Sequence, residues 1–253
     1  MEKQMRNTLG FTLAEVLITL GIIGVVAALT MPVVVRKFKI IELHTRFNKE
    51  YAVIQQAMKQ TLADFELSRP SDMRVYYNND SNKVKESFDE INKIWESKFK
   101  GATKVKASTY NFKPVFYYFF GEQSGIYGTT YNNYYLLPDG SLISDLGYHM
   151  SYGNLVVPYV FFDTNGFNKG PNRIGYDQFF YHNEGEIEPL FGNADFKLDC
   201  DPFLKNRVNG YWDRMQLSAC SGYALRNINP YDVSKKYWDS LYKPKSWWEK
   251  LKK

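Results

Sequence analysis

The chain of 253 residues has little of what most enzymes depend on. It holds only three histidines, His44, His149 and His182, and no two of them are close in sequence. The metal-binding motif His-Glu-x-x-His, the nucleophile motif Gly-x-Ser-x-Gly and phosphate-binding loops are all absent. Ser97 and Lys100 match Ser-x-x-Lys, but the companion Lys-Thr-Gly is missing, so we attribute this match to chance. These absences predict a chain without catalysis of its own.

Excess charge is also missing from most of the chain. The net charge is +5, and residues 235–253 account for all of it with seven lysines against two acids. The remainder is close to neutral, so the composition argues against a specific nucleic-acid partner. The same tail holds Trp238, Tyr242, Trp247, Trp248 and Leu251. We favour an interpretation in which these side chains cover the core while the lysines stay in water; the alternative is contact with an anionic membrane surface or a partner.

One long apolar run is present, directly after a short polar leader. Residues 16–35 are almost entirely apolar and would form a helix of roughly 30 Å, the thickness of a bilayer's hydrocarbon core. The leader ends at Gly10, before the apolar run, and Phe11 follows. An ordinary secretory signal is cut after its apolar stretch. Cleavage after Gly10 would instead leave the apolar helix on the mature chain.

Two residues of this segment are unusual for a simple membrane anchor. Glu15 places a carboxylate in the span at a cost of roughly 2.5–3.5 kcal/mol on insertion scales, so we expect it to have a partner and a function. The expected partner is the new α-amino group of Phe11, on the same or a neighbouring chain; the alternative is a glutamate near the helix end that pairs with nothing. Pro32 lacks an N–H and is expected to kink or locally melt the helix.

These features resemble the class III signal of type IV pilins and type II secretion pseudopilins. The resemblance covers about the first 35 residues and rests on Gly10, Phe11, Thr12, Leu13, Glu15 and Pro32. It implies that a prepilin peptidase cuts after Gly10 and N-methylates Phe11. It also implies that Glu15 neutralises the N-terminus of an adjacent subunit, and that Pro32 marks where the helix loosens in the filament.

The resemblance implies a domain organisation and a set of partners. Residues 1–10 would be a leader peptide, 11–35 a transmembrane and assembly helix, and 36–253 a periplasmic or extracellular head. The protein is expected to cross the inner membrane once with its head outside the cytoplasm, and then to enter a periplasmic or cell-surface filament. Its expected partners are the prepilin peptidase, other pilin or pseudopilin subunits, an inner-membrane assembly platform and the membrane.

The rest of the sequence predicts an α+β head. Apolar residues at helical spacing indicate that the first helix continues past the membrane and ends at residues 68–71. These residues are Phe47, Tyr51, Ile54, Met58, Leu62 and Phe65. A second amphipathic helix is expected at 84–99, and strands at 114–120, 131–137, 141–143, 155–162 and 177–181. Pro138-Asp139-Gly140 predicts a hairpin turn. The expected fold is a long N-terminal helix packed on an antiparallel sheet.

Cys200 and Cys220 are the only cysteines. Because the head would lie outside the cytoplasm, we expect a disulfide between them. Closing a loop of about 21 residues would contribute roughly 3 kcal/mol in the chain-entropy model. The alternative is two free buried thiols; a metal site is less favoured, because no clustered His or second Cys pair supplies further ligands.

Residues 163–177 form an expected loop rich in Asp, Asn and Gly. Asp163, Asn165 and Asp177 offer oxygen ligands of the kind that calcium prefers. Some pseudopilins carry calcium in a comparable C-terminal loop, although the spacing here is not that of an EF-hand. The same residue types are common in turns. We favour a structural loop over a calcium site and expect no other cofactor.

The sequence therefore predicts a filament subunit, a pilin or pseudopilin, that works by assembly. One alternative is a membrane-anchored extracytoplasmic binding protein that does not polymerise. Another is an anchored enzyme of unfamiliar chemistry. Neither alternative requires Glu15 or a cut before the apolar helix.

Overall fold

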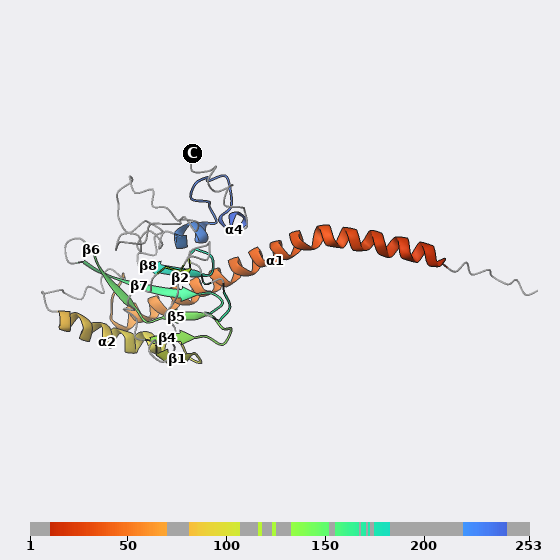
Figure 1. The fold of residues 1–253 in the computed structure, drawn as a ribbon. Coiled ribbons are helices and arrows are strands. Elements are labelled where there is room, and N and C mark those ends of the chain that lie inside the picture. Colours follow the sequence, from red (N-terminus) through yellow and green to blue (C-terminus); the bar gives the residue numbers. More distant parts are fainter. Residues whose placement is uncertain are drawn as a thin grey trace, which may run out of the picture. The chain divides into compact units, whose positions relative to one another are not determined.

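A computed structural model describes residues 11–69, 81–106, 116–117, 123–124, 133–151, 155–166, 168–170, 172, 175–182 and 220–241 (Figure 1). The elements are, in chain order, α1 (Leu13–Asp64), α2 (Ser81–Ser97), β1 (Thr103–Lys106), β2 (Phe116–Tyr117), β3 (Gln123–Ser124), β4 (Asn133–Leu136), β5 (Leu142–Ser144), β6 (Gly147–Ser151), β7 (Leu155–Asp163), β8 (Gln178–His182) and α4 (Tyr237–Ser240). The chain divides into two units, Met1–Glu42 and Leu43–Lys253, and α1 runs through both. The fold is α+β, as the sequence predicts.

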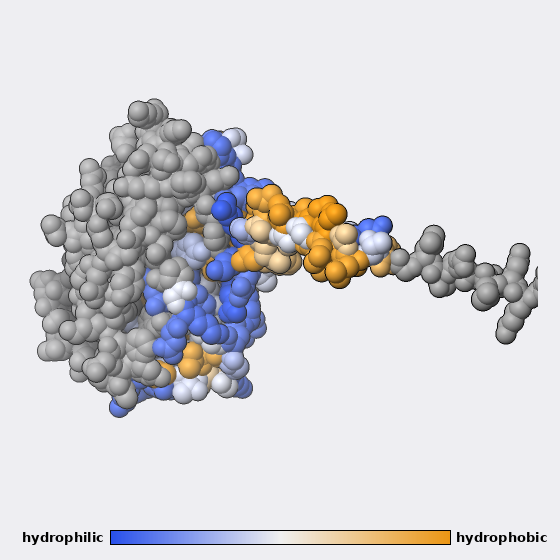
Figure 2. All heavy atoms as spheres, turned by 45° about the vertical axis from the view of Figure 1, so that its right-hand side comes forward, coloured by the Kyte–Doolittle hydropathy of each residue, from blue (hydrophilic) through white to orange (hydrophobic). Residues whose placement is uncertain are grey.

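The first unit holds the apolar part of α1. Large apolar side chains are exposed around this part of the helix, among them Leu17, Ile23 and Val33, each about 60% exposed. Figure 2 shows this part of α1 as a largely orange, hydrophobic surface. By length and composition α1 is able to cross a membrane. In water such a surface is unfavourable, so it indicates an apolar environment or partner.

Pro32 lies inside α1, and the helix is continuous across it. The structure shows no local melting at Pro32, and the expectation that this proline kinks or loosens the helix stays a prediction. Proline removes one backbone hydrogen bond and costs about 3 kcal/mol in a helix interior. A helix of 52 residues keeps enough bonds on either side to remain unbroken.

The second unit buries the other part of α1, and the predicted apolar stripe is confirmed from Phe47 to Leu62, whereas Phe65 lies beyond the end of α1 and is only partly buried. Phe47 and Ile54 are fully buried, and Tyr51, Met58 and Leu62 are buried with them. The helix ends at Asp64, a few residues before the expected stop.

A specific turn ends α1 at this point. Glu66 adopts a positive φ of 55°, and its N–H bonds the carbonyl oxygen of Ala63 at 3.1 Å. The Leu67 N–H bonds the carbonyl oxygen of Leu62 at 2.9 Å. These two bonds form a Schellman motif, which satisfies the last carbonyl groups of the helix.

β7 is the central strand of the main sheet, whose strand order is β1-β4-β5-β7-β6 with β8 also paired to β7. β8 lies along one edge of β7, where Phe161 pairs with Phe180. β5 and β6 share the other edge, β5 opposite the end of β7 and β6 opposite its start. All pairs are antiparallel, and β2 and β3 form a separate two-stranded ladder.

The line of β5 and β6 is broken at Asp145 and Leu146, and α2 covers the break. The Asn92 side chain donates to the Leu146 carbonyl oxygen at 3.1 Å and accepts from the Leu146 N–H at 2.8 Å. The indole N–H of Trp95, which is fully buried, donates to the Ser144 carbonyl oxygen at 3.1 Å. The backbone groups that lose a strand partner are thereby satisfied, as buried polar groups must be.

The C-terminal part of the described chain covers the core. Trp238 is 1% exposed and packs against Phe47 and Phe179, with ring centroids 5.4 and 5.9 Å apart. Its indole N–H donates to the Ala224 carbonyl oxygen at 3.0 Å. This confirms the favoured interpretation for Trp238. The other aromatic residues of the tail, from Tyr242 onward, lie outside the described residues.

Candidate functional site

The start of α1 carries the residues of the sequence signal. Phe11 is 88% exposed, and Gly10 lies outside the described residues. The backbone N–H and the hydroxyl of Thr12 both donate to Glu15 Oε2 at 2.8 Å. In return, the Glu15 N–H donates to Thr12 Oγ1 at 3.2 Å. This reciprocal pair is a capping box, which satisfies N–H groups at the helix start.

The capping box is a feature that the sequence interpretation above missed. Its signal was present, because Thr12 and Glu15 have the spacing of the Ser/Thr-x-x-Glu pattern. Glu15 thus has a partner within its own chain, in addition to the amine expected from cleavage. The carboxylate is bonded to the residue that follows Phe11, so it lies next to the position where that amine would form.

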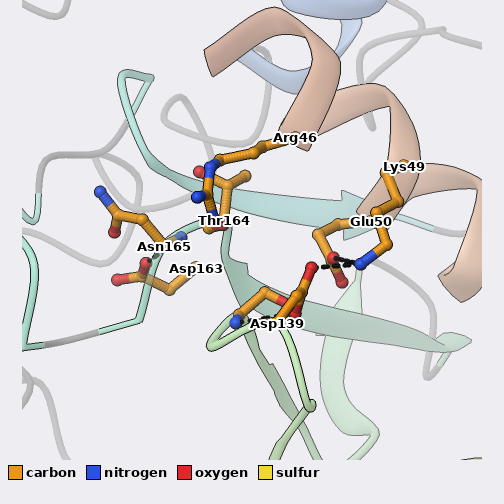
Figure 3. A network of polar contacts seen from close by, with 8 residues as sticks. Arg46, Lys49, Glu50, Asp139, Asp163, Thr164 and Asn165 are labelled. Atoms are coloured by element: carbon orange, nitrogen blue, oxygen red, sulfur yellow. Dashed lines mark hydrogen bonds and ion pairs between the residues drawn. The ribbon is translucent and has the colours of Figure 1, made fainter. Parts of the chain in front are cut away.

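A second group of polar side chains lies where the hairpin turn at residues 137–141 meets the loop after β7 (Figure 3). Gly140 and Gly166 bring the two loops into direct contact. Both have a positive φ, 90° and 79°, and a Cβ atom on Gly166 would lie 2.3 Å from the Gly140 carbonyl oxygen. Only glycine fits such a position without a shift of the backbone.

Asp163 ends β7 and shapes the following loop. Its Oδ1 accepts the backbone N–H groups of Asn165 at 3.1 Å and Gly166 at 2.7 Å. Its Oδ2 accepts the Gln178 Nε2 at 3.0 Å. The carboxylate is fully buried; its two bonds to the following backbone N–H groups are those of a residue that forms a turn, and the bond from Gln178 ties the turn to β8.

Asp177 lies beside Asp163 and is also fully buried. Its Oδ2 accepts the Asn165 side-chain amide at 3.2 Å and the Asn172 N–H at 2.9 Å. Burial and then the charge of Asp177 raise the pKa of the Asp163 carboxyl from 3.8 to about 7. The structure thus brings together the three residues named for calcium. Donors of the protein already engage both carboxylates, and calcium at this loop stays a proposal.

α1 supplies two cations to the same end of the sheet. Arg46 donates to the Thr164 carbonyl oxygen at 3.4 Å, and Lys49 forms an ion pair with Asp139 in the hairpin turn. Burial acts to raise the pKa of Asp139, but its hydrogen bonds, first that from Lys49, outweigh burial and lower it to about 2. Lys49 also lies 3.5 Å from Glu50, a buried residue whose pKa is raised by burial. Figure 3 shows these contacts, which attach both loops to the helix.

The predicted disulfide is only half within the described chain. Cys220 is fully buried and is not a free thiol. Cys200 lies outside the described residues, so the bond between the two stays a prediction. Among the described residues, no group of three His, Cys, Asp or Glu side chains is placed to hold a metal ion.

Comparison with known proteins bears on the N-terminal signal. Residues 5–31 match the family described as the prokaryotic N-terminal methylation motif. No curated protein and no solved structure matches the chain. The matched residues span the end of the leader, Phe11, the capping box and most of the apolar part of α1. The chain therefore carries the class III signal of type IV pilins.

Proposed function

We propose that this chain is a structural subunit of a type IV pilus or a type II secretion filament, processed by a prepilin peptidase. The order of signal and helix carries the proposal. The methylation motif at residues 5–31 overlaps the exposed apolar part of α1, so a cut after Gly10 leaves that helix on the mature subunit. The mature chain is first held in the inner membrane and then enters a periplasmic or cell-surface filament.

α1 suits a subunit that both anchors and assembles. Its first part is apolar on all sides, and its second part is buried in the second unit. At Gly21 and Gly24, an added Cβ atom would meet nothing within 4 Å in the described part of the chain, apart from its chain neighbours and the backbone of the helix itself, so both positions are open to a neighbouring helix. Small residues allow close approach of helices in an apolar environment. The anchor helices of several subunits then bundle, and the heads lie outside the bundle.

Glu15 gives the assembly a direction. In the single chain its carboxylate is held by Thr12. In the filament, the methylated amine of Phe11 on an adjacent subunit offers it an opposite charge. Such a pair forms only when two subunits meet in the correct axial register, because both groups are otherwise surrounded by apolar side chains.

The two alternative functions do not require all the features of the N-terminal segment. A membrane-anchored binding protein or an anchored enzyme needs an apolar helix, but it needs neither a cut before that helix nor a carboxylate within it. The signal implies a structural subunit and its processing enzyme as a partner. In the head, the polar side chains at the end of the main sheet form turns and attach loops to α1. These contacts support a structural role.

Mass spectrometry of the chain from the membrane fraction of a host with a prepilin peptidase tests the proposal. We expect a mature N-terminus at methylated Phe11, and an uncut chain for a Gly10→Val variant or a host that lacks the peptidase. A matched control is Gly24→Val, which changes a glycine inside the helix and should leave the cut in place. A mature start after Ala27 or Ala28 would mean an ordinary secretory signal and would refute the proposal.

A further inference from the structure

A group of three cations directly follows the apolar run of α1. Arg36, Lys37 and Lys39 come immediately after the 16–35 segment, and all three are exposed. The sequence holds no acid between Glu15 and Glu42. Within the described residues, none of the three cations forms an ion pair or a side-chain hydrogen bond. They are therefore free to bind an anionic partner.

Apolar side chains accompany the cations on this turn of the helix. Successive residues of an α-helix are about 100° apart, so Phe38 lies opposite the middle of the arc of cations, Ile41 lies beyond one end of the arc, and Ile40 lies within it. Phe38 is 67% exposed and Ile41 is 52% exposed, which leaves both apolar side chains uncovered. Long Lys and Arg side chains beside apolar ones suit the boundary between lipid tails and headgroups, because their apolar stems can lie along the tails while the charges stay at the headgroups.

The position of the cations along the helix fits the same boundary. The apolar run spans roughly 30 Å, the thickness of the hydrocarbon core. Arg36 to Lys39 then covers about 4.5 Å more, which lies within the roughly 5–8 Å of one headgroup layer. When the helix spans the bilayer, all three charges are placed at the level of the lipid phosphates.

Topology signals do not account for this cluster. Lys and Arg are normally enriched on the side of a span that stays in the cytoplasm. Here the leader carries Lys3 and Arg6, whereas the flank on the side of the head carries three cations within four residues. This distribution works against the orientation that the class III signal requires, so the cluster calls for another role.

We propose that Arg36, Lys37 and Lys39 bind anionic phospholipid headgroups of the leaflet next to the head, and hold the subunit in the membrane until it is assembled. The inference rests on the proposed membrane-anchored state. Each cation attracts the anionic surface, while Phe38 and Ile41 enter the adjoining apolar layer. Extraction into a filament must break these contacts, so the cluster sets part of the force that assembly has to supply.

The full-length chain, reconstituted in phosphatidylcholine vesicles, tests this proposal. Electron spin resonance reports the fraction of a spin-labelled lipid that the protein restricts in its motion. We expect the wild type to restrict labelled phosphatidylglycerol more than labelled phosphatidylcholine, and added salt to weaken the preference because it screens charge. Each cation removed should lower the preference by up to about fivefold, equivalent to about 1 kcal/mol.

The decisive variant is Arg36→Gln, Lys37→Gln and Lys39→Gln together, which should restrict both lipids equally. The matched control replaces Lys59, Lys93 and Lys100, three exposed lysines of the second unit, by Gln and should keep the wild-type preference. Equal restriction of both lipids by the wild type, or an unchanged preference in the variant, overturns the proposal. Reduced filament entry of a variant that keeps its lipid preference would assign the cations to contacts between subunits instead.

Resistance to alkaline extraction separates this proposal from the proposed function. If the wild-type chain is washed off the vesicles at high pH, it does not span the membrane, and both proposals fall. If it resists extraction but shows no lipid preference, only the headgroup proposal falls.

Discussion

Replacement of Phe47 by alanine is the most direct test of how α1 packs within the second unit. The Phe47 ring is fully buried. It meets the Phe179 ring edge-on, with centroids 4.6 Å apart and planes at 66°. It also lies 5.4 Å from Trp238 and 5.8 Å from Phe162. The side chain thus joins the helix, strands β7 and β8, and the C-terminal segment.

The expected loss of stability follows from these contacts. A Phe→Ala change in a well-packed core costs roughly 3–5 kcal/mol, because transfer free energy is lost and a cavity remains. For a domain of roughly 150–250 residues, each 1 kcal/mol lowers Tm by about 2–4 °C. The change should therefore lower Tm by roughly 6–20 °C. The upper part of the range is expected, because rings on three sides restrict collapse into the cavity.

Thermal unfolding of the full-length chain in detergent, followed by near-ultraviolet circular dichroism, measures this loss. Phe38→Ala is the matched control, since it makes the same change in the same helix where the ring is 67% exposed. Surface changes of this kind usually stay within about 0.5 kcal/mol. A Tm for Phe47→Ala equal to that of the control would refute the packing of α1 on β7 and β8.

The remaining predictions concern Glu15 in the N-terminal signal, the buried Asp163 and the two cysteines. Glu15→Val should insert at least as well as the wild type, because removal of the carboxylate lowers the insertion cost; it should be absent from sheared filaments, and normal incorporation would contradict the pairing of subunits. From about pH 4 to pH 7 the folded state binds more protons at Asp163 than the unfolded state, so the free energy of unfolding should fall as pH rises. In urea unfolding, the Asp163→Asn variant should show a weaker dependence of this free energy on pH. If calcium binds this loop, millimolar calcium above pH 7 should raise stability by roughly 2.7 kcal/mol at a hundredfold excess over Kd; an unchanged Tm, or a shift that survives Asp163→Ala, would assign the loop to turn formation alone. Intact mass after non-reducing alkylation should show Cys200 and Cys220 protected, and two alkylated thiols would rule out the disulfide.

The parts of the fold that the sequence predicts are those with a local signal. The spacing of Phe47, Tyr51 and Ile54 follows one face of a helix, and the structure buries that face. Residues 137–141 contain a proline and an Asp-Gly pair, and the structure places the expected hairpin turn there, with Gly140 at a φ of 90°. In both cases the controlling interactions lie within a few residues of one another, so the pattern is visible without knowledge of the fold.

The features that the sequence does not predict depend on residues far apart in the chain. The Asn92 side chain satisfies the backbone hydrogen bonds of Leu146, which lies 54 positions later in the chain. No local pattern marks either residue. The contact of Gly140 with Gly166 likewise exists only once two separate loops meet. The site at the end of the sheet is partly of the same kind, since Asp163 and Asn165 are named from the sequence, whereas Gln178, whose side chain donates to Asp163 from 15 positions away, is not.

Glu15 combines a local signal with one that lies beyond the single chain. An N-terminal cap is worth about 0.5–2 kcal/mol. A charged side chain at the centre of a membrane span costs roughly 2.5–3.5 kcal/mol, and this is an upper value for Glu15, which directly precedes the apolar run of residues 16–35. The bonds from Thr12 offset part of the cost of placing the carboxylate there. The residual is a free energy that an opposite charge on a neighbouring subunit would recover, and it is the physical reason to expect that Glu15 acts between chains as well as within its own.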